Sequence, residues 1–422
     1  MVTLHKRLIL GILCVLCTFS IMAQRNETLL PDIHTLQVEN LSREWDMPIV
    51  RLGSNNQLLI SFDHLTDEYH RFVYKIVHLD AQFRPSTSLF ERDFVETNAE
   101  TVPIEDYEES MNTITHYVHY QFVFPNRDIR PKISGNYRLD ILLDEDDEPI
   151  PVAHVYFYVL DEQINTGLTV TTNTDIDWNQ SHQQVEMRLT SSQLEVRDPE
   201  SELYVYVLQN RRWDNAAINP LPTYINGREL IWHNTRPLIF PAANEYRRFE
   251  MLSTRYAGIG LERMQWFDPY YHASLFPDDP RPNYLYEQDI NGRFVVRTED
   301  NQDSASESEY VWVHFSLNCD HIEGYDIYVN GDFTDNRFAP AYRLHYNFGH
   351  QAYEGRVYLK TGYYNYQYLA VKKGGTTGQT LPIEGDYYQT ENEYDALIYY
   401  KQPGSRYWQL VGRGHTDFKL TH

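Results

Sequence analysis

Strict alternation of apolar and polar residues is the feature that most limits what this chain can fold into. In residues 310–317, Val311, Val313 and Phe315 fall on one face, while polar or aromatic residues fall on the other. A period of two is typical of a half-buried β-strand, and helical periodicity is scarce elsewhere. Comparable runs occupy residues 72–79, 114–124, 137–143, 152–160, 203–208 and 363–371. Short strands separated by turn signals predict an all-β fold of tandem immunoglobulin-like β-sandwich domains.

The length of 422 residues is too great for one ordinary domain. The acidic, serine-containing stretch 299–309 has no apolar periodicity and predicts a linker. A weaker boundary is expected at residues 161–165, between two strand-rich regions. We therefore expect an N-terminal β-sandwich over 25–163, a middle β-sandwich over 164–298, the acidic linker 299–309 and a C-terminal domain over 310–422.

The first 24 residues have the pattern of a cleaved secretory signal peptide. Lys6 and Arg7 precede an apolar run over 8–22, and Ala23-Gln24 follows. This run of about 15 residues is shorter than the roughly 20 needed to span a bilayer, and no comparable run follows it. We predict an exported protein that does not span the membrane. Because the other two cysteines lie inside the signal peptide, Cys319 has no partner for an intramolecular disulfide.

Acidic residues dominate the charge of the chain. Asp and Glu number 60 against 36 Lys and Arg, which gives a formal net charge of -24. Such a surface repels phosphate backbones and anionic lipid head groups. The charge therefore excludes nucleic acid as a partner and disfavours a charge-driven membrane surface.

Catalytic and metal-binding motifs are missing from the sequence. The acidic run 144–148 lacks the alternate ligands of a calcium loop and predicts a solvated hairpin tip. His116 and His119 are three apart in a predicted strand, which points them to opposite faces. No His-Glu-x-x-His, Gly-x-Ser-x-Gly or phosphate-binding glycine-rich motif occurs. We predict a non-enzymatic protein without a metal, a cofactor or a small-molecule substrate.

Tyrosine is unusually frequent, with 34 residues and clusters at 270–271, 363–368, 387–388 and 399–400. Tyrosine suits strands, and it also covers recognition surfaces at a low entropic cost. For any single tyrosine we expect packing in a core or on a sheet. The excess at neighbouring strand positions favours a binding protein.

Several stretches stand in a specific order and spacing along the chain. They are residues 58–63, 119–126, 129–131, 134–137, 208–210, 212–216, 289–294, 382–388 and 390–394. Together with the signal peptide, they resemble the plug protein family of the Bacteroidota type IX secretion system over nearly the whole mature chain. The resemblance implies a periplasmic protein held against the inner face of the outer membrane. It also implies that the protein binds the giant outer-membrane translocon barrel from the periplasmic side and seals its pore in the absence of cargo.

The last part of the chain is similar to the early-set, immunoglobulin-like fold of family 48 carbohydrate-binding modules. The similarity lies in residues 329–335 and 359–368. In those modules a tryptophan commonly follows the short loop motif, whereas this chain has Asn336. The resemblance implies an early-set domain over 310–422. It leaves a periplasmic or surface glycan-binding module as the alternative function.

One short segment combines the residue types that anchor protein interfaces. Arg212, Trp213, Asp214 and Asn215 follow a predicted strand and offer a cation, an aromatic ring and hydrogen-bonding groups. We predict this segment as a partner-binding site for the translocon barrel. The alternative is a packed segment that braces the middle domain.

Overall fold

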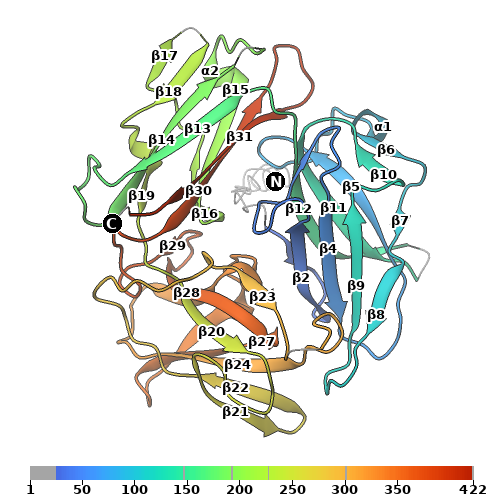
Figure 1. Ribbon diagram of the computed structural model, residues 1–422, viewed down its shortest axis with the longest axis vertical. Coiled ribbons are helices and arrows are strands. Elements are labelled where there is room, and N and C mark those ends of the chain that lie inside the picture. Colours follow the sequence, from blue (N-terminus) through green and yellow to red (C-terminus); the bar gives the residue numbers. More distant parts are fainter. Residues whose placement is uncertain (1–24, 146–147, 192, 227, 300–301, 421–422) are drawn as a thin grey trace, which may run out of the picture.

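The computed structural model describes residues 25–145, 148–191, 193–226, 228–299 and 302–420. Almost all of its regular structure is β, which confirms the all-β prediction. The strands form three lobes that lie side by side around a common centre (Figure 1). The predicted signal peptide lies outside the described residues.

The N-terminal lobe is a β-sandwich. Its first sheet contains β1 (Glu27–Thr28), β12 (Ile150–Leu160), β11 (Gly135–Leu143), β5 (Phe72–Leu79) and β7 (Val102–Pro103), with β3 (Ile49–Arg51) beside β12. Its second sheet contains β2 (Ile33–Asn40), β4 (Leu58–His64), β9 (Val118–Phe124) and β8 (Asp106–Glu109). A short helix α1 (Glu91–Phe94) and the ribbon of β6 (Val95–Thr97) and β10 (Ile129–Pro131) lie at one edge. Strand β9 alternates buried and half-buried residues along its length, as its sequence pattern predicts.

The middle lobe is a sandwich of two sheets. One contains β13 (Asn165–Thr171), β14 (His182–Thr190), β18 (Glu229–Trp232) and β17 (Tyr224–Asn226), with β19 (Ile239–Pro241) beside β14. The other contains β16 (Arg212–Ile218), β15 (Leu203–Gln209), β30 (Asn392–Tyr400) and β31 (Gln409–Phe418). The short helices α2 (Pro199–Glu202) and η1 (Arg236–Leu238) precede β15 and β19.

The third lobe is built on ten connected strands. Along the sheet these are β20 (Arg247–Met251), β28 (Gly362–Lys372), β25 (Tyr325–Asn330), β26 (Arg343–Asn347), β27 (Ala352–Lys360), β24 (Tyr310–Leu317), β22 (Tyr270–Leu275) and β21 (Leu261–Phe267), while β23 (Phe294–Val296) and β29 (Gly378–Gln379) pair with β28. The short helices η2 (Asp332–Thr334) and η3 (Pro340–Tyr342) follow β25. One hydrophobic core contains residues from both ends of this sheet, so the sheet folds over on itself.

The sheets group the residues differently from the expected boundaries at 298 and 310–422. Strands β20 to β23 belong to the third lobe, and the last two strands, β30 and β31, return to the middle lobe beside β15. The physical reason is the complete burial of β30, which packs against the core of the middle lobe on one face and against the N-terminal lobe on the other. A strand buried on both faces has no alternation that reveals its partner.

The later part of the stretch expected to be an acidic linker is packed, whereas Gln302 and Asp303 are exposed. Ser306 and Ser308 are fully buried, and Glu309 is 8% exposed. The Glu309 carboxylate accepts hydrogen bonds from the backbone N–H groups of Ile114 and Thr115. The segment therefore ties the third lobe to the N-terminal lobe, because its polar groups find partners there.

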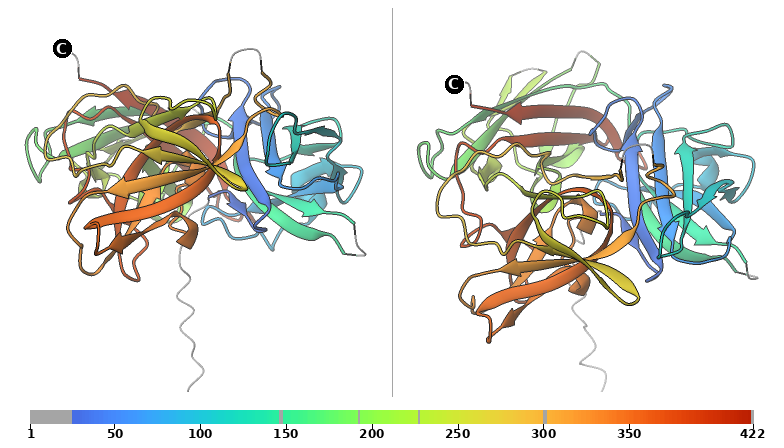
Figure 2. Two further views of the ribbon diagram at one scale, coloured as in Figure 1. Left: turned by 90° about the horizontal axis from the view of Figure 1, so that it is seen from below. Right: turned by 60° about the horizontal axis from the view of Figure 1, so that its bottom comes forward.

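A shared hydrophobic core joins the N-terminal and middle lobes. Its buried members come from both lobes: Met47, Ile49, Leu79, Ala81, Phe83, Tyr158 and Leu160 on one side, and Tyr206, Leu208, Leu397, Tyr399 and Leu410 on the other. The hydroxyl of Tyr399 donates to the side-chain oxygen of Asn136 over 2.6 Å across this interface. Because apolar surface is buried between them, the two lobes behave as one rigid unit. Further views show that the third lobe lies against both (Figure 2).

Candidate functional site

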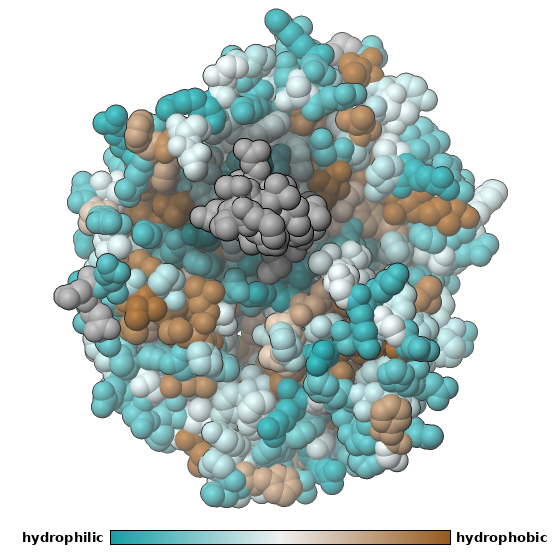
Figure 3. All heavy atoms as spheres, turned by 180° about the vertical axis from the view of Figure 1, so that it is seen from behind, coloured by the Kyte–Doolittle hydropathy of each residue, from teal (hydrophilic) through white to brown (hydrophobic). Residues whose placement is uncertain are grey.

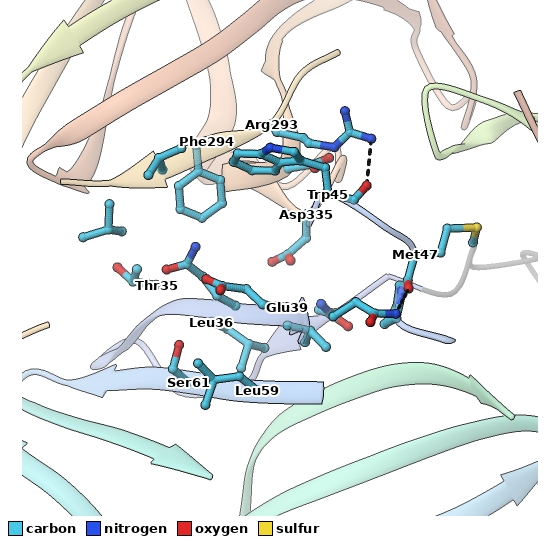
Figure 4. Close-up of a pocket in the computed structure, with 18 of the residues that line it drawn as sticks. Thr35, Leu36, Glu39, Trp45, Met47, Leu59, Ser61, Arg293, Phe294 and Asp335 are labelled. Atoms are coloured by element: carbon cyan, nitrogen blue, oxygen red, sulfur yellow. Dashed lines mark hydrogen bonds between the residues drawn. The ribbon is translucent and has the colours of Figure 1, made fainter. Parts of the chain in front are cut away.

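A hollow lies where the three lobes meet, with a cavity volume of about 630 Å³ and a lining of both polar and apolar residues. Seen from behind, hydrophilic and hydrophobic residues both lie around the central region of the molecule (Figure 3). The walls of the hollow come from β2 and the loop after it, from β23, and from the loop after β25 (Figure 4). The side chains around this hollow form the junction that fixes the lobes.

Arg293, immediately before β23, contacts all three lobes. Its guanidinium donates to the Glu393 carboxylate of the middle lobe over 2.6 Å. It also donates to the backbone oxygen of Trp45 in the N-terminal lobe over 3.2 Å (Figure 4). Both members of the ion pair are buried, with side-chain exposures of 8% and 5%. A buried charge pair in this geometry resists separation of the lobes, because parting them leaves each charge alone.

A second buried cluster joins the N-terminal lobe to the third lobe. The Asp63 carboxylate lies 2.7 Å from Lys360 Nζ, and it accepts hydrogen bonds from His119 Nδ1 and the Tyr310 hydroxyl. Asp63 and Lys360 have side-chain exposures of 0% and 1%. Burial alone would raise the pKa of Asp63, but Lys360 and His119 hold it below its usual value. Asp63 is therefore charged, and its carboxylate interacts with three side chains.

The predicted segment 212–215 lies in β16, at a joint between lobes. Arg212 and Asp214 form a buried ion pair over 2.7 Å. They also bond the backbone oxygen and N–H of Gly378 in the third lobe, and Arg25 lies 3.4 Å from Asp214. Arg212 holds the pKa of Asp214 below its usual value, although burial alone would raise it. The geometry is that of an internal brace.

The other two residues of this segment are half-buried. Trp213 packs edge-on against Phe83, with ring centroids 5.2 Å apart. The Asn215 amide donates to Gln209 over 3.1 Å. Partner binding through residues 212–215 stays a prediction.

A third cluster lies on β30 and β31. Arg413 pairs with Asp395 over 2.9 Å and with Asp46 of the N-terminal lobe. His415 and Asp417 lie close enough to Glu393 to share an ion. The Glu393 carboxylate, however, is held by Arg293, and cations beside a carboxylate oppose a metal ion. This geometry favours an ion-pair network rather than a metal centre.

Three carboxyl groups at or beside the hollow have raised pKa values. Burial raises the pKa of Asp335 to about 8, and its carboxylate points into the hollow (Figure 4). Burial likewise raises the pKa of Glu245 to about 7 and of Asp289 to about 6. These groups bind protons more tightly in the folded protein than in the unfolded chain.

We expect the protein to be less stable at pH 8.5 than at pH 6.5. A carboxyl group whose pKa is raised by folding stabilises the folded protein at low pH, and this stabilisation is lost as the pH rises through the pKa of the group in the folded protein. Because Asp335 and Glu245 are such groups, the free energy of unfolding should decrease toward pH 8.5. Burial lowers the pKa of His78 and His314 to about 4, so their contribution is lost as the pH falls below about 6.5. Urea unfolding at pH 5, 6.5 and 8.5 measures this. Stability that keeps rising to pH 8.5 contradicts it.

The other residues singled out in the sequence have mainly structural surroundings. His119 bonds Asp63, whereas His116 lies before β9 and is exposed. Of the acidic run 144–148, residues 146–147 lie outside the described residues; Asp144 and Glu145 pair with Arg71 and His70. The tyrosine clusters are largely core, with Tyr364, Tyr368, Tyr399 and Tyr400 buried. Tyr270 is 41% exposed and lies on an outer face of the third lobe.

The loop after β25 bears on the similarity to carbohydrate-binding modules. Asn336 is buried, and its amide donates to the Asp332 carboxylate over 2.9 Å. Asn336, at the position where those modules commonly carry a tryptophan, is thus buried within the loop. The family 48 similarity stays a prediction.

Sequence reasoning missed the charged residues that join the lobes. Asp63 and Lys360, and likewise Arg293 and Glu393, are far apart in the sequence and carry no local pattern. A signal was nevertheless present, because Asp63, His119, Arg293 and Glu393 all lie within the stretches that resemble plug proteins.

Comparison with known proteins supports a family assignment. Residues 33–161 match the family model of the type 9 secretion system plug protein first domain. A hypothetical protein from Parabacteroides merdae, known from a crystal structure, is 37% identical over 93% of this chain and 99% of its own, with a TM-score of 0.90. No curated protein matches.

Two further solved structures have little in common with this chain. An enterococcal surface protein region is 8% identical over 95% of this chain and 96% of its own, with a TM-score of 0.17. The BspA C-terminal domain of Streptococcus agalactiae is 7% identical over 90% of this chain and 99% of its own, with a TM-score of 0.15. Neither carries a structural argument. The chain therefore belongs to the same family as the Parabacteroides merdae protein, and the match of its N-terminal lobe to the plug protein first domain supports the type 9 secretion system plug family.

Proposed function

We propose that this protein is a non-enzymatic plug of the type IX secretion system. It binds the periplasmic side of the outer-membrane translocon barrel and seals the pore when no cargo is passing. The observation that carries the proposal is the match of residues 33–161 to the plug protein first domain. The match supports a role in type IX secretion. That the protein closes the translocon barrel is our proposal beyond this match.

The shape of the molecule supports steric closure. A sandwich of about 130 residues has a diameter of roughly 35 Å. A barrel of about 36 strands is roughly 70 Å across before side chains narrow it. One lobe cannot cover such an opening, whereas three lobes around one centre form a broad body (Figure 1).

Rigidity is the second requirement of a plug. The lobes are joined by the shared core between the N-terminal and middle lobes and by the buried pairs of Arg293 with Glu393 and of Asp63 with Lys360. Each charged group of these two pairs is bonded to its opposite charge in another lobe. This arrangement fits a structural role better than a catalytic one.

The proposal places the protein in the periplasm, as the plug family suggests. Export would use the predicted signal peptide over 1–24. Among the described residues, no helix is long and apolar enough to cross a membrane. Attachment to the outer membrane would then come from binding the barrel.

Deletion of the gene tests this function. A plug that is missing leaves the barrel open, so the mutant is expected to become sensitive to antibiotics that are too large to cross the intact outer membrane. Growth inhibition by such an antibiotic is measured in the deletion strain, in the complemented strain, and in a strain that lacks both protein and barrel. If the deletion strain still contains the barrel and its antibiotic sensitivity is unchanged, the proposal is wrong.

A further inference from the structure

One outer face of the third lobe is both aromatic and cationic. We call it the aromatic–arginine face and define it by Phe267, Tyr270, His272, Trp312, Arg356 and Tyr358. It lies on β21, β22, β24 and β27, opposite the face that covers the core of the lobe. Phe267 is 57% exposed and Tyr270 is 41% exposed. Exposed rings that lie next to one another on one face mark a candidate interaction surface.

Strand register explains why these side chains share one face. His272 pairs with Trp312, and Trp312 pairs with Tyr358, so the three side chains form one row across the sheet. Phe267 contacts the His272 ring and Tyr270 contacts the Tyr358 ring, with centroids 5.4 and 5.7 Å apart. The face is therefore a continuous and rigid platform.

This outer face carries two arginines, Arg263 and Arg356, although the chain as a whole is acidic. Among the described residues, no carboxylate forms a salt bridge with Arg263 or Arg356, which project from β21 and β27. His272 and His314 stack 5.1 Å apart between them. Burial, together with the neighbouring His272 and the two arginines, lowers the pKa of His314 to about 4. The two arginines bring positive charge to this face, although the chain has a formal net charge of -24 and Asp268 lies in the turn between Phe267 and Tyr270.

The position of Arg356 indicates what kind of partner this face can accept. Its guanidinium lies over the Trp312 ring, 4.4 Å from the centroid. This cation–π contact covers the ring face on which a sugar would stack. It also holds the guanidinium in place for a carboxylate, which arginine binds through two parallel hydrogen bonds.

We propose that the aromatic–arginine face is the surface by which this protein contacts the translocon barrel, at a segment of the barrel that carries carboxylates beside apolar side chains. The inference rests on the proposed function and adds the contact face to it. Aromatic residues and arginine are enriched in the buried centres of protein interfaces. The opposite charge of a carboxylate segment selects this face over the acidic remainder of the surface.

Two variants and two matched controls test the proposal in the full chain. Arg356→Glu reverses the charge at that position, and Phe267→Ser with Tyr270→Ser removes the exposed rings. The controls are Arg127→Glu, whose side chain is 88% exposed, and Trp178→Ser, which is 69% exposed; both lie away from this face. Each tagged protein is purified from detergent-solubilised envelope, and the co-purified barrel is quantified. All four sites are exposed, so unfolding curves are expected to match the wild type.

We expect both test variants to lower barrel recovery by at least about tenfold, the effect of losing a hot-spot contact. Both controls should recover the barrel like the wild type, and added salt should lower wild-type recovery. If the wild-type protein recovers no barrel, both the proposed function and the proposed contact face are wrong. If the wild type and all variants recover equal amounts, only the contact face is overturned. Variants that retain the barrel but lose gel retardation by a soluble glucan would reassign the face to glycan binding.

Discussion

Replacing Lys360 with methionine is expected to lower the free energy of unfolding by about 3–5 kcal/mol. The substitution removes the ammonium 2.7 Å from Asp63 and leaves that carboxylate buried, with only His119 and Tyr310 as partners. Methionine has a similar length and fills the space, so the loss measures the charge and not a cavity. Equilibrium urea unfolding, followed by tryptophan fluorescence, gives the change.

The double variant Asp63→Asn with Lys360→Met is the matched control. It removes both charges together, and replacing a whole buried pair is often close to neutral. We expect the double variant to be more stable than Lys360→Met alone. A single variant that unfolds at the wild-type urea concentration would show that this pair does not hold the N-terminal and third lobes together.

Replacing Arg293 with methionine is expected to cost about 3 kcal/mol, at the lower end of the range for breaking a buried ion pair. The reason for the lower value is Arg211, whose Nε lies 3.3 Å from Glu393 and remains in place. The variant also loses the hydrogen bond to Trp45, so the third lobe loses contacts to both neighbours. The same urea experiment measures the change, and limited proteolysis shows whether the lobes separate.

Arg188→Met is the control for this substitution. Arg188 pairs with Glu229 over 3.2 Å, but its side chain is 65% exposed. Exposed pairs contribute about 0–1 kcal/mol, so this variant should unfold like the wild type within about that margin. Equal losses for Arg293→Met and Arg188→Met would contradict a special role of the junction.

The sequence predicted the elements better than their grouping. Strand 310–317 forms over the predicted residues, and β9 forms over 118–124, the later part of the predicted run 114–124; both show the alternation of a sheet with one buried face. Strand β30 is buried on both faces, so its pattern does not reveal that it pairs with β15. The pairing of strands nearly 200 residues apart depends on three-dimensional packing, which a local pattern does not record.

The candidate site was predictable only in part. Arg212, Trp213, Asp214 and Asn215 were singled out for their chemistry, and the structure places Arg212 and Asp214 in a buried pair between lobes. Composition indicates a residue type that can form strong contacts, but it does not distinguish a contact inside the molecule from one to a partner. The tyrosines show the same limit, because Tyr399 is fully buried while Tyr270 is exposed.

The most direct test of the account is the ion conductance of the purified translocon barrel in a planar bilayer. The barrel alone, free of cargo, should conduct as a wide pore. Adding this protein to the side that corresponds to the periplasm should close it in a concentration-dependent way, and adding it to the other side should have no effect. An unchanged current at saturating protein would contradict the claim that this rigid three-lobed body seals the pore.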